Sequence, residues 1–166
     1  TGIYATSSGG LRIENNTVAN TTTGIELQSS GNSQVINNTI TNTTTAIVLD
    51  SSGGATVKYN TLINATNYFK LVYSWENTTL DNLVGIDENN LVRLNISSFH
   101  GDLQIGSVTS PPSPPQNYKA LGDKYYLSIE NLTSNANAHI TLFYSDEDIS
   151  GLDERTMKIW HYNGSA

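Results

Sequence analysis

The chain has 166 residues, of which 14% are charged, and its formal net charge is −7. Its eight Lys and Arg residues are scattered singly, so no basic stripe is available to neutralise nucleic acid phosphates. It has no cysteine, which excludes disulfides, thiolate metal sites and cysteine nucleophiles. It also has no run of 18 apolar residues, so we expect no membrane span in this sequence.

A 22-residue repeat opens the chain. Its three copies cover residues 2–23, 24–45 and 46–67 without gaps. Within a copy, short apolar alternations such as Ile25 and Leu27 are separated by Ser-Ser-Gly and Asn-Thr-Thr clusters, which favour turns. One copy cannot bury its own apolar face, so the copies must stack about 4.8 Å apart. The sequence therefore predicts a parallel β-solenoid, entered in mid-repeat at Thr1, and we expect the chain to be an excerpt from a longer protein.

Two polar rows of the repeat invite a functional interpretation. Asn16, Asn38 and Asn60 fall in one row, and we interpret them as stacked amides that hydrogen-bond to the next coil. The threonine runs at 21–23 and 43–45 suggest the flat faces of ice-binding solenoids. Because the third copy departs from the run and the runs are predicted at a turn, ordinary turn chemistry is the favoured interpretation.

The pattern Gly-Ile-x-Leu-x-Ser-Ser-Gly-Asn, followed by Ile-x-Asn-Asn-Thr-Ile-x-Asn, runs from Gly24 to Asn42. It resembles the right-handed parallel β-helix repeat of NosD-like and other carbohydrate-binding and sugar-hydrolase (CASH-type) proteins, which are abundant on archaeal cell surfaces. The resemblance covers residues 2 to about 73, with 68–71 as the strand of a fourth coil. It implies the fold, but the repeat serves lyases, hydrolases and inert spacers alike.

The rest of the chain is predicted to hold a cap, a linker and a second unit. The register fades after Tyr73, and residues 73–108 are expected to complete the solenoid domain, 1–108, with a terminal cap. All four prolines fall in a linker at 109–117. Predicted strands at 125–129, 139–144 and 157–162 then indicate a small antiparallel β-sandwich-like domain at 118–166. This unit resembles a module of archaeal and bacterial surface proteins that normally continues further, so we expect it to be truncated.

The densest carboxylate cluster suggests a calcium site. Asp146, Asp148, Ser150 and Gly151 match the first half of a calcium-binding loop, but position twelve of that loop is Met157 instead of Glu. An EF-hand is therefore excluded. Two interpretations stay open: a Ca²⁺ site of Asp146, Asp148 and Asp153, or an N-capping turn before a short helical segment.

No catalytic residues are predicted. Glycoside hydrolysis needs two facing carboxylates about 5–9.5 Å apart. Glu14, Glu26 and Asp50 are the carboxylates of the three copies, and they occupy different positions of the repeat. The three histidines lie far apart without the spacing of metal ligands.

Candidate N-glycosylation sites are frequent, which suits a secreted surface protein. The asparagines that fall in Asn-x-Ser/Thr sequons are Asn15, Asn20, Asn37, Asn42, Asn64, Asn77, Asn95, Asn131 and Asn163.

The favoured hypothesis is a non-catalytic, extracellular cell-surface protein with a structural or adhesive role that binds carbohydrate, with glycans or cell-envelope proteins as partners and no cofactor other than Ca²⁺. A second hypothesis is a piece of a polysaccharide lyase or glycoside hydrolase whose catalytic coils lie upstream. A third is a self-assembling filament or sheath subunit that associates through the solenoid ends.

Overall fold

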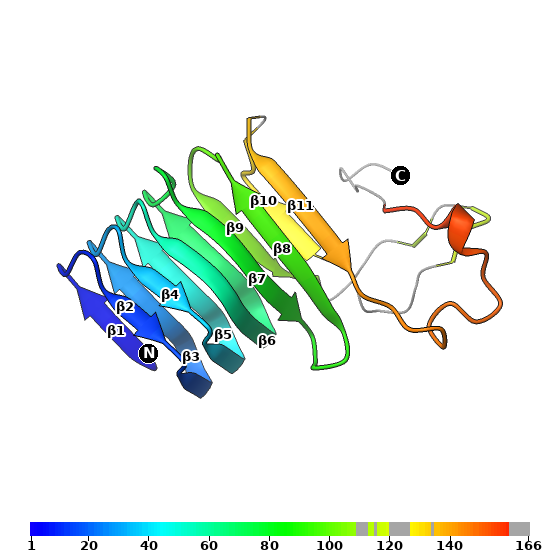
Figure 1. The fold of residues 1–166 in the computed structure, drawn as a ribbon, viewed down its shortest axis with the longest axis horizontal. Helices are drawn as coiled ribbons and strands as arrows, with labels where there is room; N and C mark the ends of the chain where they lie inside the picture. Colours follow the sequence, from blue (N-terminus) through cyan, green and yellow to red (C-terminus); the bar gives the residue numbers. More distant parts are fainter. Residues whose placement is uncertain (109–112, 115, 120–126, 134, 160–166) are drawn as a thin grey trace.

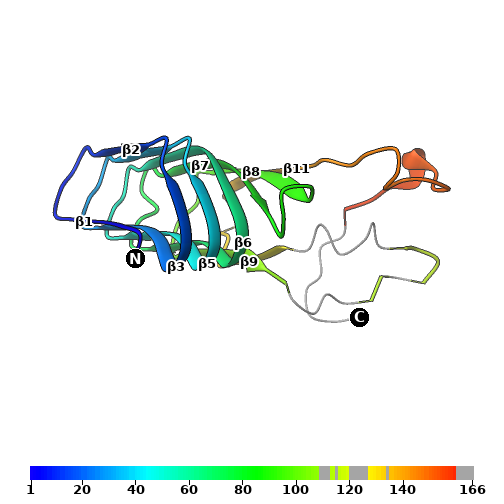
Figure 2. The same cartoon turned by 90° about the horizontal axis from the view of Figure 1, so that it is seen from below.

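The computed structural model describes residues 1–108, 113–114, 116–119, 127–133 and 135–159. The chain winds into a stack of coils whose strands lie side by side in a single sheet system (Figures 1 and 2). The elements are β1 (Ile3–Thr6), β2 (Arg12–Glu14), β3 (Thr17–Gln28), β4 (Gln34–Ile36), β5 (Thr39–Asp50), β6 (Thr56–Val72), β7 (Thr79–Gly85), β8 (Leu91–Ser97), β9 (Leu103–Ser107), β10 (Leu127–Glu130), β11 (Asn137–Leu142) and the 3₁₀ helix η1 (Glu154–Thr156).

The coils stack in parallel at the predicted period. Ile25 of β3 lies opposite Ile47 of β5, which lies opposite Phe69 of β6, so each partner is 22 residues further along the chain. This confirms the predicted β-solenoid. The long strands bend at Asn20 and Asn42, whose φ angles of 56° and 54° lie in the left-handed region that asparagine tolerates better than most residues.

The core is a set of apolar columns with one residue per coil. Ile25, Ile47 and Phe69 form one column, and all three are completely buried. Burying a side chain of this size stabilises the fold by about 1.5–3 kcal/mol, so coil-on-coil packing holds the solenoid together. The parallel columns are Leu27, Leu49 and Leu71; Val35, Val57 and Leu80; and Ile40, Leu62 and Val84.

A buried asparagine row runs beside these columns. The backbone N–H of Asn38 donates to Asn60 Oδ1 at 2.9 Å, and Asn60 Nδ2 donates to the carbonyl of Val35 at 2.8 Å. Asn60 Nδ2 also donates to Asn82 Oδ1 at 2.8 Å. The predicted architectural role of this row is thus confirmed, because its amides satisfy backbone groups that water cannot reach.

The fourth coil keeps its register further than the sequence analysis expected. Thr79 of β7 lies opposite Thr56 at a spacing of 23, whereas Val84 lies opposite Leu62 at a spacing of 22. One extra residue enters at the corner, and an irregularity between Lys58 and Thr61 restores the register. The repeat therefore continues past Tyr73 instead of fading there: Ser74 and Asn82 lie 22 residues after Ser52 and Asn60, and the strand start between them is shifted by one residue.

Parallel stacking ends at β8 and β9. β8 runs antiparallel to β7, and β9 runs antiparallel to β6. At this end, the N–H of Tyr73 donates to Asp102 Oδ1 at 2.8 Å. One coil earlier, the corresponding N–H of Ser51 donates to the carbonyl of Val72 at 2.9 Å. The Asp102 carboxylate therefore replaces the carbonyl that a further coil would supply.

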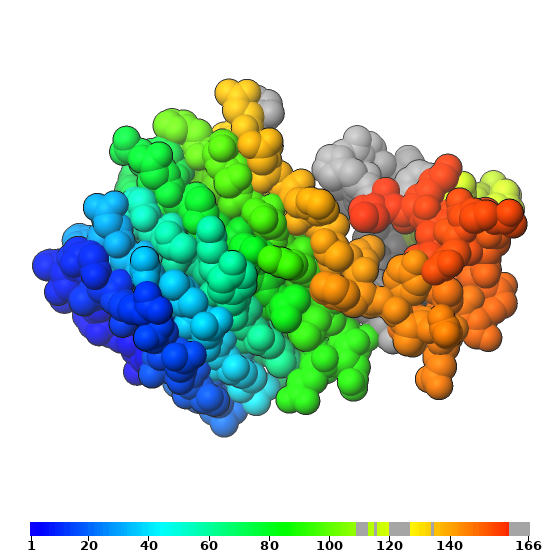
Figure 3. Space-filling view, viewed as in Figure 1, coloured from blue at the N-terminus to red at the C-terminus, as the bar shows by residue number. Residues whose placement is uncertain are grey.

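Two strands of the expected C-terminal unit extend the solenoid sheet. β10 pairs antiparallel with β9, and β11 pairs antiparallel with β8. In Figure 3 the orange residues of β11 lie against the green residues of β8. Strands were predicted here, but as partners in a separate sandwich. Every strand in the described residues belongs to the one sheet system. Of the predicted third strand, 157–159 are not extended into a sheet and 160–162 lie outside the described residues, as does most of the proline-rich segment.

Candidate functional site

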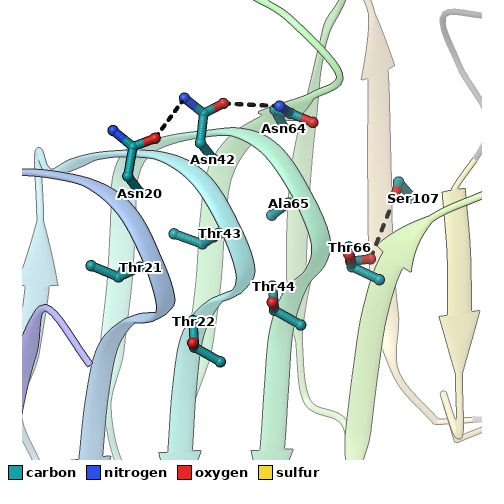
Figure 4. Close-up of a pocket in the computed structure, with 10 residues that line it drawn as sticks. All are labelled: Asn20, Thr21, Thr22, Asn42, Thr43, Thr44, Asn64, Ala65, Thr66 and Ser107. Atoms are coloured by element: carbon teal, nitrogen blue, oxygen red, sulfur yellow. Dashed lines mark hydrogen bonds between the residues drawn. The ribbon is translucent and has the colours of Figure 1, made fainter.

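A shallow groove crosses three coils just beyond the bends of the long strands (Figure 4). Its volume is about 580 Å³. The residues that line it are Asn20, Thr21, Thr22, Asn42, Thr43, Thr44, Asn64, Ala65, Thr66 and Ser107. None of these side chains is charged, so the groove offers amides, hydroxyls and methyl groups only.

An exposed asparagine row forms one side of the groove. Asn42 Nδ2 donates to Asn20 Oδ1 at 3.3 Å, and Asn64 Nδ2 donates to Asn42 Oδ1 at 2.9 Å. Each amide nitrogen carries a second hydrogen, and each amide oxygen has a second lone pair. The row is therefore a line of fixed donors and acceptors that repeats once per coil, about every 4.8 Å.

A threonine row forms the other side. Thr22, Thr44 and Thr66 are exposed, one on each coil, and Figure 4 shows them in line along the groove. Correcting the expectation of a turn, the threonine runs lie inside β3 and β5, beyond the asparagine bends. The Ser107 hydroxyl of β9 donates to the carbonyl of Thr66 at 3.4 Å and bounds the groove at the third coil.

The floor of the groove contains a buried hydroxyl. Thr43 is 7% exposed, and its Oγ1 has no hydrogen-bond partner among the described residues. In the preceding coil the equivalent hydroxyl is hydrogen-bonded, since Thr21 Oγ1 donates to the carbonyl of Thr23 at 2.9 Å. In the next coil the equivalent residue is Ala65, which has no hydroxyl group.

The carboxylates of the repeat lie outside the groove, and each of them falls in a different row of the repeat. Glu14 forms an ion pair with Arg12 at 2.5 Å, and this hydrogen-bonded guanidinium lowers the pKa of Glu14. Glu26 accepts a hydrogen bond from the Thr1 hydroxyl at 3.1 Å, and Asp50 accepts one from the Ser51 hydroxyl at 2.9 Å. In the pairing register they occupy three different rows, as the sequence indicated.

All the sequon asparagines that the structure describes are exposed. Most of them have φ angles in the left-handed region, at corners between strands or at bends within the long strands: Asn15, Asn20, Asn37, Asn42, Asn64, Asn77 and Asn131. Asn95 lies on β8, and Asn163 lies outside the described residues. The side chains are accessible to a modifying enzyme, and glycosylation itself stays a prediction.

Two of the three proposed calcium ligands, Asp148 and Asp153, have local hydrogen-bond partners. Asp148 Oδ2 accepts hydrogen bonds from the N–H and hydroxyl of Ser145 at 2.9 and 3.0 Å. Asp153 caps η1 and binds the Arg155 side chain, which lowers the pKa of Asp153. Asp146 is exposed. The N-cap that Asp153 supplies is the feature that the alternative interpretation expected, and the Ca²⁺ site stays a prediction.

In the described part of the chain, no group of three or more His, Asp or Glu side chains is positioned to hold a metal ion. Nor does that part contain a helix with the length and apolar character that crossing a bilayer requires.

Most of the groove residues stand out in the sequence, but their shared surface does not. Asn20, Asn42 and Asn64 fall in sequons, and the threonines fall in runs typical of turns. The shared spacing of 22 residues was the available indication that both sets form rows on one surface. Ser107 had no such indication, because β9 reaches the groove by an antiparallel return.

Comparison with protein-family models matches residues 1–102 to the family described as "Right handed beta helix region". Searches of curated proteins and of solved structures returned no match. The matched segment comprises more than half of the chain and covers β1 to β8, ending just before β9. The chain therefore belongs to the right-handed β-helix family.

Proposed function

We propose that this chain is part of a non-catalytic, extracellular cell-surface protein with a structural or adhesive role, and that its groove binds a glycan. The observation that carries the proposal is the groove itself, in which exposed asparagine and threonine rows face one ligand-sized space without a charged side chain. Sugars present closely spaced hydroxyls that both donate and accept, so rows of amides and hydroxyls complement them.

The scaffold supports binding by holding these side chains in place. The exposed amides bond to one another, and the strands beneath them bury apolar columns on every coil. Side chains that are already ordered lose little conformational entropy when a ligand binds. A groove of this kind suits recognition of a repeating ligand, because its donors and acceptors repeat with the coils.

The lining also favours binding over catalysis. General acid–base cleavage of a glycosidic bond needs a pair of carboxyl groups facing the scissile bond. The ten lining residues include no carboxyl group, and the carboxylates of the repeat lie in other rows. Exposed sequon asparagines support the extracellular location, since such sites are glycosylated along the secretory route.

The proposal places a condition on glycosylation. Neighbouring rungs of the exposed asparagine row are about 4.8 Å apart, which is too close for every rung to carry a glycan. A glycan attached to Asn42 would itself fill the groove. Intact-mass and peptide analysis of the native protein should find Asn42 unmodified, and full occupancy there would contradict a binding role for the groove.

A nuclear magnetic resonance titration tests the binding directly. Cellohexaose, mannohexaose and chitohexaose are added in turn to the protein, and the side-chain amide signals of Asn42 and Asn64 are followed. We expect at least one of these neutral oligosaccharides to shift both signals. Thr44→Ala should weaken the effect, whereas Thr39→Ala, on the same strand but outside the groove, should leave it unchanged.

The proposal fails if none of the three oligosaccharides moves the amide signals. It also fails if the two threonine variants behave alike, because the binding would then not depend on the groove.

A further inference from the structure

A second surface stands out at the corner that follows β6. The first residue of this corner is a serine in three successive coils, Ser7, Ser29 and Ser51, and a tyrosine, Tyr73, in the fourth. All four have left-handed backbones, with φ between 49° and 53°. A bulky residue is rarely found in this region. Tyr73 is also 68% exposed, so burial of its ring does not explain its presence.

The neighbours of Tyr73 hold its ring in place. Its ring centroid is 5.9 Å from that of Trp75, with the planes tilted by 52°. Trp75 in turn packs edge-on against His100 at 5.3 Å and contacts the apolar core. We call Tyr73, Trp75 and His100 the aromatic corner. The backbone below it is fixed by the bond from the Tyr73 N–H to Asp102.

Polar groups flank the aromatic corner. Asp102 lies at the Tyr73 backbone, and on the adjacent coil Asp50 Oδ1 accepts a hydrogen bond from the Ser51 hydroxyl. A purely apolar partner would have to remove these carboxylates from water without replacing their hydrogen bonds, which is unfavourable. An anionic partner would be repelled by them.

A pyranose ring meets both conditions. Its axial C–H groups form an apolar face that packs on an aromatic ring, while its hydroxyls lie at the edge, where they donate to carboxylates. We infer that the aromatic corner is a carbohydrate subsite for an uncharged pyranose unit, separate from the groove of asparagine and threonine rows.

The repeat supplies matched variants for the test. Tyr73→Ser restores the residue that the three earlier coils carry with the same backbone, so the fold should be kept. Tyr59 is the control: it is 61% exposed, has a φ of 59°, and follows Asn15 and Asn37 in its own row. Tyr59→Asn is therefore an equivalent reversion at a corner that lacks the aromatic neighbours. Both variants are checked by circular dichroism.

The titrations use calorimetry with cellohexaose, mannohexaose, chitohexaose and hexagalacturonate, in the Asn42→Ala background so that the groove does not contribute. We expect a neutral oligosaccharide to bind this background and hexagalacturonate to bind more weakly. Tyr73→Ser should weaken the neutral binding about tenfold. Tyr73→Phe, which keeps the ring, and Tyr59→Asn should leave it unchanged.

Three results would overturn the inference: no neutral oligosaccharide binds the Asn42→Ala protein, Tyr73→Ser binds as the background does, or Tyr59→Asn weakens binding equally. None of these results decides whether the groove binds, because the groove is judged separately by the amide signals of Asn42 and Asn64. Failure of the aromatic corner and failure of the proposed function are thus distinguishable.

Discussion

Two asparagine rows run along this solenoid, four residues apart in three successive coils, and their hydrogen bonds differ. The buried row of Asn16, Asn38, Asn60 and Asn82 bonds to backbone groups, as when Asn60 receives the N–H of Asn38 and donates to the carbonyl of Val35. The exposed row of Asn20, Asn42 and Asn64 bonds only side chain to side chain in the contacts that the structure gives.

The comparison shows that residue type and spacing do not by themselves distinguish scaffold from surface. What distinguishes the rows is the dependence of the backbone on the amide. A buried N–H or carbonyl without a partner is destabilising, so the inner row is fixed by the fold. The outer row leaves no backbone group orphaned, so its donors and acceptors are available to a ligand.

The largest expected effect is from the inner row. Asn60→Ala leaves the N–H of Asn38 and the carbonyl of Val35 buried without their partner, and we expect it to lower the free energy of unfolding by roughly 3–5 kcal/mol. Urea denaturation measures the change. If Asn60→Ala lowers the free energy of unfolding by no more than an ordinary surface substitution does, the inner row would not support the fold more than the outer row.

The end of the solenoid provides the next test. If side chains that hydrogen-bond to the backbone contribute most to stability, Asp102→Ala should destabilise the protein by about 1 kcal/mol, because the Tyr73 N–H loses its acceptor. Asp102→Asn keeps an oxygen acceptor and should recover most of the loss. Thermal unfolding of the two variants checks this, and equal melting temperatures would show that the contact does not cap the coil.

Thr43 follows Asn42 on the same strand, and removing its hydroxyl should change the stability in the opposite direction. Its hydroxyl is buried without a partner among the described residues, so Thr43→Val, which keeps the shape, should stabilise the protein by about 1 kcal/mol. Thr21→Val serves as the matched control and should not stabilise, since the Thr21 hydroxyl is bonded. The same denaturant titration measures both, and a destabilised Thr43→Val would refute this reading of the groove floor.

The bond between two side chains at Asp81 and Arg93 should appear in the pH dependence of stability. Arg93 contacts Asp81 through two bonds of 2.7 Å, and these bonds lower the pKa of Asp81 below its ordinary value of 3.8. Because the folded-state pKa is the lower one, the stabilisation is present above pH 3.8 and is lost as the pH falls through the folded value. The melting temperature of the wild type should therefore exceed that of Asp81→Asn at pH 6, and the difference should shrink as the pH falls below 3.8 through the folded-state pKa of Asp81.

The smallest expected change in stability is from the outer row. Asn42→Ala removes two bonds between exposed amides and should alter the free energy of unfolding by no more than about 0.5 kcal/mol. Urea denaturation of this variant beside Asn60→Ala gives the contrast within one experiment. A loss as large as that of Asn60→Ala would assign the outer row to the scaffold as well.

The repeat made much of the fold predictable. Ile25 and Ile47, or Asn38 and Asn60, fall 22 residues apart without a gap, and parallel stacking turns that spacing directly into contact. Ser74 and Asn82 keep the same spacing to Ser52 and Asn60, but the strand start between them is shifted by one residue, so the fourth coil matches the repeat only in part.

The remaining errors share a physical cause. An antiparallel strand pairs with whichever sheet edge is unpaired in the folded protein, and the local sequence pattern does not indicate which edge that is. Strands near 127–130 and 137–142 were expected, but their pairing with β9 and β8 was not. Ser107 reaches the groove, and Asp102 reaches Tyr73, by the same non-local route. The asparagines and threonines of the groove were individually visible, whereas their shared space depends on the bend at Asn42.

The central claim is that the outer row binds a ligand without supporting the fold. Its most direct test is a calorimetric titration of cellohexaose, mannohexaose and chitohexaose into Tyr73→Ser protein with and without Asn42→Ala, so that only the groove differs. We predict that Asn42→Ala abolishes binding to the oligosaccharide that the groove accepts while the melting temperature is unchanged. Equal affinity in the two proteins would contradict the account.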